Sequence, residues 1–212
     1  AQNKGYAERN PEADVEGHDP ARKIAILTSL ITGKKVDFED IYCEGITKVT
    51  TEDIAYAKKL GLSIKLLATS KKIGEQYSIM VTPKMLGVAH PLFAVNDVFN
   101  AIFVKGNMLG DSMFYGSGAG KLPTASAVVG DIVDAAKNPN RSVMAAWDEE
   151  KLELEDKADT IKKYFVRIKG AVSDLKAQLE TAFGPITVVT LDLTHKISSS
   201  RRKSSEISPV SS

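Results

Sequence analysis

Two residues near the start of the chain, Asp19 and Lys23, can together bind a charged ligand and move a proton. The pair Asp19-Pro20 predicts a helix start, because an Asp side chain caps free amides and proline fits the first helical position. Lys23 follows one turn later on the same side of the helix expected over 20–33. Large apolar residues flank Lys23 there, so we expect its ammonium to lie in the buried stripe with Asp19 as its partner.

The opposite side of this helix carries small residues, including Ala25 and Ser29, and is expected to face away from the core. Two interpretations of the lysine follow. It either snorkels past the helix start beside a structural cap, or it belongs to a site. Three further carboxylates, those of Glu8, Asp14 and Glu16, precede it in a loop. Several carboxylates beside one desolvated lysine favour a site for an amine and a transferable proton.

Ordered motifs extend from this region along more than half of the chain. The first group comprises Gly5-Tyr6-Ala7-Glu8, Pro11, Ala13-Asp14-Val15-Glu16-Gly17, Asp19 and Ala21-Arg22-Lys23. The later motifs are His90-Pro91-Leu92, Val98-Phe99-Asn100-Ala101, Phe114-Tyr115-Gly116-Ser117-Gly118-Ala119-Gly120 and Leu122-Pro123-Thr124-Ala125-Ser126-Ala127-Val128-Val129. In this order they resemble the catalytic region of the homoserine dehydrogenase family. The resemblance covers roughly residues 3 to 137.

The resemblance implies NAD(P)-dependent interconversion of L-homoserine and L-aspartate 4-semialdehyde, a step in threonine, methionine and isoleucine biosynthesis. By position, it implies that Glu8 and Asp14 bind the substrate, with Glu8 at its ammonium. It makes Lys23 the proton donor to the developing alkoxide, held by Asp19, which also contacts the substrate. NAD or NADP supplies the hydride. The role of the protein is therefore to position the reactants and to provide electrostatic stabilisation. The nucleotide-binding half, a second lysine and a sodium-binding loop are expected upstream, so these residues alone should be inactive.

Gly116, Gly118 and Gly120 lie between an expected strand and an expected helix. Glycine allows positive φ and close approach of a ligand, and a helix N-terminus favours negative charge. The segment is not a phosphate loop, because Tyr115 and Leu122 break that motif, and it is not a dinucleotide fingerprint. The motif alone favours a structural turn. The resemblance implies instead that the segment faces the cofactor, with Gly120 as the principal contact.

Composition narrows the class of protein. The 212 residues are 43% hydrophobic and 26% charged with net charge +1, which is typical of a globular protein and gives no argument for nucleic-acid or membrane binding. The single cysteine, Cys43, excludes an intramolecular disulfide and is expected to be an inert core thiol. The three histidines lack metal-ligand spacing, so we expect no metal site. The cytoplasm is the expected compartment, and a start at Ala1 suggests the C-terminal part of a longer polypeptide.

The pattern of elements predicts an α+β fold, with a mixed, largely antiparallel sheet, helices on one face, and then a small partial βαβ unit. Residues 1–19 are expected to form a loop. Capping residues at 50–53 and a glycine at 61 delimit a second helix. The remaining expected elements are strands at 63–69, 76–82, 98–104 and 111–115 and a helix at 123–137.

Three regions are expected along the chain. Residues 1–141 form the catalytic and dimerisation domain, and 142–193 a charged linker and a partial unit resembling the start of an ACT-type regulatory domain. Within that unit we expect a strand at 164–169, a helix at 172–183 and a strand at 186–191. Residues 194–212 are Ser-rich and basic, and we expect them to be disordered.

A homodimer through the sheet is expected, because two strands offer apolar surface that one layer of helices covers incompletely. The residues concerned are Val98, Ile102, Val104, Met113 and Tyr115. The alternative function is a non-catalytic dimerisation or effector-binding module with a vestigial site. An upstream Gly-x-Gly-x-x-Gly strand–helix unit would favour the enzyme.

Overall fold

The computed structural model describes residues 10–140, 147–156, 162–168 and 172–191. At its centre lies a three-stranded sheet with the order β2 (Tyr42–Cys43), β4 (Gln76–Gly87), β3 (Leu62–Ile73). Strands β3 and β4 pair antiparallel along their whole length, and the turn between them holds Gly74 at φ +60°. The predicted hairpin is therefore confirmed, with both strands longer than expected.

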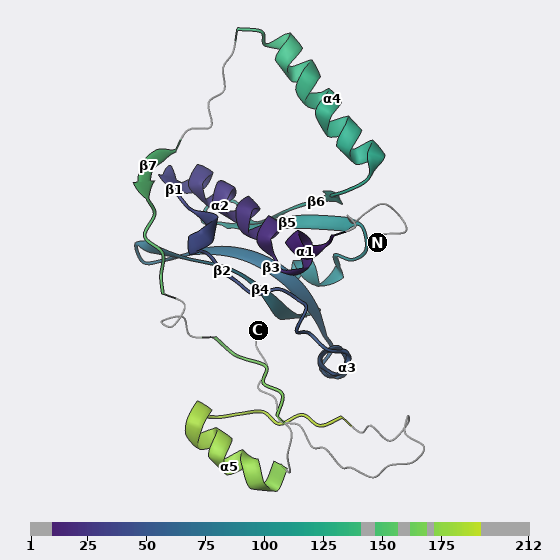
Figure 1. Ribbon diagram of the computed structural model, residues 1–212, viewed down its shortest axis with the longest axis vertical. Coiled ribbons are helices and arrows are strands. Elements are labelled where there is room, and N and C mark those ends of the chain that lie inside the picture. Colours follow the sequence, from purple (N-terminus) through teal and green to yellow (C-terminus); the bar gives the residue numbers. More distant parts are fainter. Residues whose placement is uncertain (1–9, 141–146, 157–161, 169–171, 192–212) are drawn as a thin grey trace.

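Helix α2 (His18–Thr32) lies across this sheet (Figure 1). Its buried residues are all small: Ala21, Ala25, Thr28 and Ser29. Ala21 and Ala25 pack against Ile41, Ile79 and Val81 in the core. The large residues Ile26, Leu30 and Ile31 are 50%, 46% and 74% exposed, so the predicted orientation of α2 is wrong. Small side chains let the helix approach the sheet closely, and this packing outweighs the simple ranking of residues by hydrophobicity.

The start of α2 also differs from the prediction. Gly17, with φ +83°, occupies the N-cap position and makes no side-chain cap. Asp19 lies one residue inside the helix, and its carboxylate pairs with Lys23 instead of capping amides. The expected loop before α2 contains a short helix, α1 (Glu12–Val15). The predicted end of α2 is confirmed, with Gly33 in the left-handed region at φ +72°.

Helix α3 (Thr51–Lys59) begins with the expected capping box. The Thr50 hydroxyl accepts a hydrogen bond from the Asp53 amide at 3.3 Å, and the Asp53 carboxylate accepts one from the Thr50 amide at 2.8 Å. Gly61 follows the helix at φ +70°. Local capping chemistry therefore determined both ends of this element.

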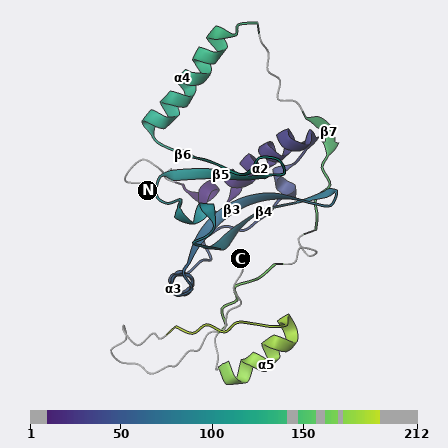
Figure 2. The ribbon, with the colours of Figure 1, turned by 180° about the vertical axis from the view of Figure 1, so that it is seen from behind.

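A second hairpin comprises β5 (Phe99–Gly106) and β6 (Gly110–Ser117), which pair antiparallel as predicted. The short helix η3 (Pro91–Ala94) contacts β5, and a second short helix, η2 (Phe38–Asp40), contacts α2. Helix α4 (Lys121–Lys137) follows β6 and extends away from the body in both views (Figures 1 and 2). None of its residues is buried. The described residues thus combine a packed body and an unpacked helical arm.

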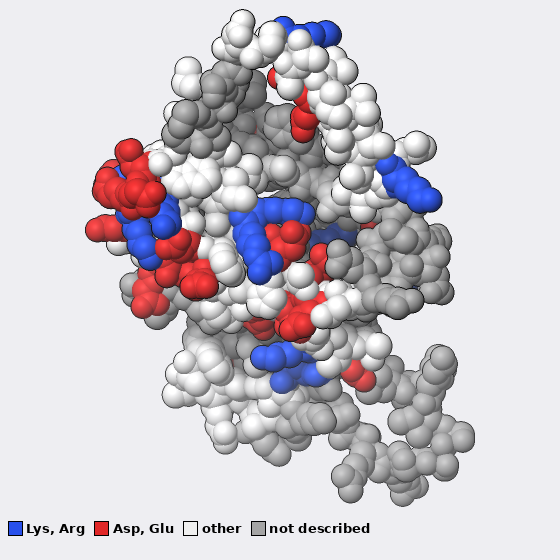
Figure 3. All heavy atoms as spheres, turned by 45° about the horizontal axis from the view of Figure 1, so that its top comes forward, with Lys and Arg blue, Asp and Glu red and all other residues white. Residues whose placement is uncertain are grey.

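The chain returns from α4 to the body through β7 (Asp148–Lys151), which pairs parallel with β1 (Lys34–Lys35). Acidic and basic side chains gather at this edge (Figure 3), including Lys34 with Glu150 at 2.6 Å. Leu152 and Leu154 then pack on the core. The segment expected as part of a charged linker thus contains a strand with exposed side chains, and two leucines after it contact the core.

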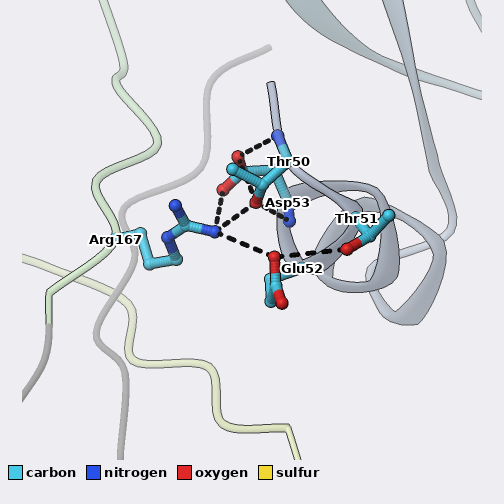
Figure 4. Close-up of polar contacts among 5 residues, drawn as sticks. All are labelled: Thr50, Thr51, Glu52, Asp53 and Arg167. Atoms are coloured by element: carbon cyan, nitrogen blue, oxygen red, sulfur yellow. Dashed lines mark hydrogen bonds and ion pairs between the residues drawn. The ribbon is translucent and has the colours of Figure 1, made fainter. Parts of the chain in front are cut away.

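The C-terminal part contains α5 (Val172–Phe183), as predicted. The described residues 162–168 and 185–191 form no strand, so the expected strands on either side of α5 are wrong there. A strand requires a neighbour for its backbone hydrogen bonds, and none pairs with them within the described ranges. Arg167 instead contacts the start of α3, 3.3 Å from Asp53 and 3.6 Å from Glu52 (Figure 4). The predicted disordered tail, residues 194–212, lies outside the described residues.

The α+β class with largely antiparallel pairing is confirmed. Within the described ranges the strands form three small sheets, β1–β7, β2–β4–β3 and β5–β6, where a single sheet was expected. No helix in the described ranges is both long enough and apolar enough to span a bilayer.

Candidate active site

The site is built around residues 12–17, here called the acidic loop, which carry Glu12, Asp14 and Glu16. Two contacts from the next segment hold this loop. The Ile46 amide donates to the Val15 carbonyl at 2.7 Å, and the Cys43 thiol donates to the Glu16 carbonyl at 3.2 Å. The Gly17 carbonyl then accepts from the Ala21 amide at 3.0 Å, which joins the loop to α2. The loop is therefore held at its C-terminal part, from Val15 to Gly17.

Asp19 and Lys23 come together as predicted, with 2.6 Å between the ammonium nitrogen and a carboxylate oxygen. Their side chains are 40% and 71% exposed, so the expectation of a buried Lys23 is wrong. The small-residue side of α2 faces the sheet, and this turns Lys23 outward. An outward-facing ion pair contributes little to stability, but it is accessible to a ligand.

The other predicted substrate residues differ in placement. Asp14 is exposed on α1, which packs against α2. Glu16 is half-buried beside Cys43. Burial raises the pKa of the Cys43 thiol, and the nearby Glu16 carboxylate adds to this, so Cys43 is a protonated hydrogen-bond donor, in keeping with an inert thiol. Glu8 lies outside the described residues.

The glycine segment connects β6 to α4. Gly116 pairs with Asn100 in the hairpin, and a Cβ on Gly118 would stand 2.0 Å from the Asn100 amide nitrogen. Gly120 caps α4 with φ +118°, a conformation that favours glycine. Local structure therefore accounts for glycine at positions 118 and 120. It does not require glycine at position 116, where a Cβ would meet open space.

A shallow hollow of about 600 Å³ opens at the first two turns of α4. Its lining residues are Gly120, Lys121, Thr124, Ala125, Val128 and Val129. The acidic loop and the first turn of α4 lie toward the same side of the molecule in Figure 1. Within the described ranges, no three His, Cys, Asp or Glu side chains are placed to hold a metal ion.

Sequence reasoning missed the segment that supports the acidic loop. Gly45 is buried between Cys43 and Ile46, and the loop backbone lies directly against it. Strand β2 spans only Tyr42–Cys43, which is too short for a periodic pattern. A buried glycine next to such a strand gives no signal in the sequence beyond its own conformational freedom.

The part of the chain that contains this site is similar to known proteins. The family model described as homoserine dehydrogenase matches residues 1–133. The chain belongs to the homoserine dehydrogenase family. The homoserine dehydrogenase of Bacillus subtilis is 44% identical over 138 residues, covering 65% of this chain and 32% of that protein. The Synechocystis enzyme is 51% identical over 138 residues, which are 63% of this chain and 32% of the relative.

The match extends further in another relative. The Helicobacter pylori homoserine dehydrogenase is 40% identical over 184 residues, covering 84% of this chain and 44% of the relative. A solved structure of a homoserine dehydrogenase from Thiobacillus denitrificans superposes with a TM-score of 0.77 at 29% identity, over 100% of this chain and 50% of that one. The S. aureus enzyme at pH 6.5 gives 0.69 at 32% identity, over 100% and 51%. The chain thus spans a third to a half of the length of these homoserine dehydrogenases.

Proposed function

We propose that this chain provides the substrate-binding part of a homoserine dehydrogenase, a cytoplasmic enzyme that interconverts L-homoserine and L-aspartate 4-semialdehyde with NAD or NADP. The observation that carries the proposal is the outward-facing pair of Asp19 and Lys23, 2.6 Å apart, next to the acidic loop in a chain of this family. The pair offers a proton donor and a carboxylate on a rigid helix. Carbonyl reduction requires a proton donor held in a fixed position.

Each residue then has a distinct role. Lys23 gives its proton to the carbonyl oxygen of the semialdehyde as that oxygen gains negative charge, and takes it back in the reverse reaction. Asp19 holds the Lys23 ammonium in place and contacts the substrate. Asp14, together with Glu8 upstream, binds the substrate, and the Glu8 carboxylate pairs with the substrate ammonium.

The cofactor contact belongs to the glycine segment in this proposal. Gly116, Gly118 and Gly120 allow close approach of the backbone, and the hollow beside Gly120 gives room at the free amides of α4. When bound there, NAD or NADP supplies or accepts the hydride. The apolar side of α4, with Leu122, Val129 and Ile132 exposed, packs on the nucleotide-binding half in this account. The sodium-type site belongs to that half as well.

Residues 1–141 are proposed as the catalytic and dimerisation domain, and 142–193 as a linker and partial ACT-like unit. A homodimer through β5 and β6 fits their exposed apolar side chains, since Ile102 and Phe114 pair across the strands on one face and are 50% and 69% exposed. Phe114→Lys should turn a dimer into a monomer by light scattering. Val88→Lys, at an 80% exposed position elsewhere, should leave the dimer intact. A dimer that survives Phe114→Lys would exclude this face.

The activity test uses a joined protein, in which this chain follows the N-terminal part of the Bacillus subtilis relative. Absorbance of the reduced nicotinamide reports oxidation of L-homoserine. We expect turnover by the joined protein and none by the chain alone. A well-folded joined protein that never oxidises homoserine would instead favour the non-catalytic dimerisation or effector-binding module.

A further inference from the structure

Gly45 is a buried residue against which the backbone of the acidic loop lies without any space for a side chain. A Cβ built on Gly45 would stand 2.3 Å from the Val15 carbonyl oxygen and 2.5 Å from the Glu16 Cα. The same Cβ would be 2.7 Å from a Glu16 carboxylate oxygen. Two of these three atoms belong to the backbone, so a side-chain rotation cannot relieve the clash. Any larger residue at position 45 must move the acidic loop.

The residues on either side of Gly45 hold the loop at this short distance. Ile46 donates its amide to the Val15 carbonyl at 2.7 Å, and Cys43 donates its thiol to the Glu16 carbonyl at 3.2 Å. We call residues 43–46 the loop seat. Cys43 belongs to β2, which pairs with β4 at Val81, so the loop seat is itself fixed to the central sheet.

The acidic loop also fits closely at its C-terminal end, where Gly17 lies. A Cβ on Gly17 would stand 2.9 Å from a Val81 methyl carbon and 3.0 Å from the Cys43 sulfur. Gly17 is buried and is the N-cap of α2, whose second residue is Asp19. A displacement of the loop at Glu16 would therefore be passed to the start of α2 and to the pair of Asp19 and Lys23.

We propose that Gly45 is a positioning residue for the protein carboxylates that bind the substrate. It acts through the backbone of Val15 and Glu16. This inference rests on the proposed function. It assigns to Gly45 the task of setting the separation between Asp14 on α1 and the Asp19–Lys23 pair on α2. A site that must hold an amino acid and a proton donor in register tolerates only small errors in such a separation.

Gly45→Ala in the joined protein tests the proposal, with Gly87→Ala as the matched control. A Cβ on Gly87 meets only a Leu62 methyl carbon at 3.7 Å, an ordinary contact. We expect Gly45→Ala to raise the KM for homoserine at least about tenfold, in line with the cost of misplacing reacting groups. The KM for the cofactor should stay unchanged, and Gly87→Ala should alter neither. An unchanged homoserine KM in Gly45→Ala would overturn the proposal.

Amide hydrogen exchange in the 212-residue chain provides a second readout that needs no activity. We expect Gly45→Ala to speed exchange at Ile46, whose hydrogen bond to Val15 the new methyl group disturbs, while the β3–β4 amides keep their protection. If protection falls across β3 and β4 as well, Gly45 is a general folding position and the proposal is wrong. This measurement tests whether Gly45 holds the acidic loop even if the joined protein does not oxidise homoserine.

Discussion

The acidic loop and the arm formed by α4 differ in how the chain supports them. The loop lies against a buried glycine, accepts hydrogen bonds from two residues of the loop seat, and continues into a helix packed on the central sheet. The arm has no buried residue, and its apolar side chains face solvent. Under the proposed function, the contrast separates a substrate side that is packed within this chain from a cofactor side that the nucleotide-binding half would cover.

The substrate side should depend most strongly on one side chain. In the joined protein, Lys23→Ala should lower kcat at least about 100-fold, as expected for loss of a positioned general acid. Lys72→Ala, at an exposed position on β3, should leave kcat unchanged. Steady-state kinetics measure both. Near-normal turnover in Lys23→Ala would remove the lysine from the mechanism.

The same substitution should be far more destabilising in the body than in the arm. Ala25→Leu adds volume where α2 contacts the core at 4% exposure, and should destabilise the chain by about 1–3 kcal/mol. Ala136→Leu, exposed on α4, should change the free energy of unfolding by less than about 0.5 kcal/mol. Thermal denaturation of the two variants compares them. Equal destabilisation would mean that α4 is packed as tightly as α2.

A smaller effect is expected where the arm meets the hairpin. Gly118→Ala brings a methyl group against the Asn100 side chain, which can rotate away at the expense of the local turn. We expect the KM for the cofactor to rise several-fold and the KM for homoserine to stay constant. The reverse pattern would place the glycine segment on the substrate side. Initial-rate kinetics with each substrate varied in turn distinguish the two.

The smallest expected effect concerns Lys84, a half-buried residue on the sheet face away from the acidic loop. Burial lowers the pKa of Lys84, and the positive charge of Lys162 adds to this. The folded state thus binds fewer protons than the unfolded state below the ordinary lysine pKa, so stability should rise as the pH approaches that value. Lys84→Met should raise the unfolding midpoint at pH 7 by a few degrees and flatten the rise up to pH 10.

Lys72→Met provides the control for this pH series, because Lys72 is exposed. It should leave both the midpoint and its dependence on pH unchanged. A Lys84→Met variant that is less stable than the parent chain at pH 7 would show that the Lys84 ammonium stabilises the fold, contrary to the sign expected from its burial.

Local signals predicted local structure well. The capping box of Thr50 and Asp53, the left-handed Gly33 and the two hairpins were all readable, because each depends on residues close together in the sequence. The pair of Asp19 and Lys23 was readable for the same reason, since four residues make one helical turn.

Predictions failed where the structure depends on contacts between segments that are far apart in the sequence. Which side of α2 is buried depends on how closely its alanines approach Val81 on β4, which periodicity does not reveal. The charged residues of β7 concealed a strand that pairs with β1. The role of Gly45 could not be predicted from the sequence, because it depends on the acidic loop packing against this residue in the folded chain.

Amide hydrogen exchange along α4 tests the central contrast most directly, measured once in the chain alone and once in the joined protein. Helices in proteins gain most of their stability from packing, which α4 lacks, so α4 amides should exchange much faster than α2 amides in the chain alone. In the joined protein, α4 should become protected to a degree comparable with α2. Equal protection of α4 and α2 in the chain alone, or no gain on joining, would contradict the account that the cofactor side is completed from outside this chain.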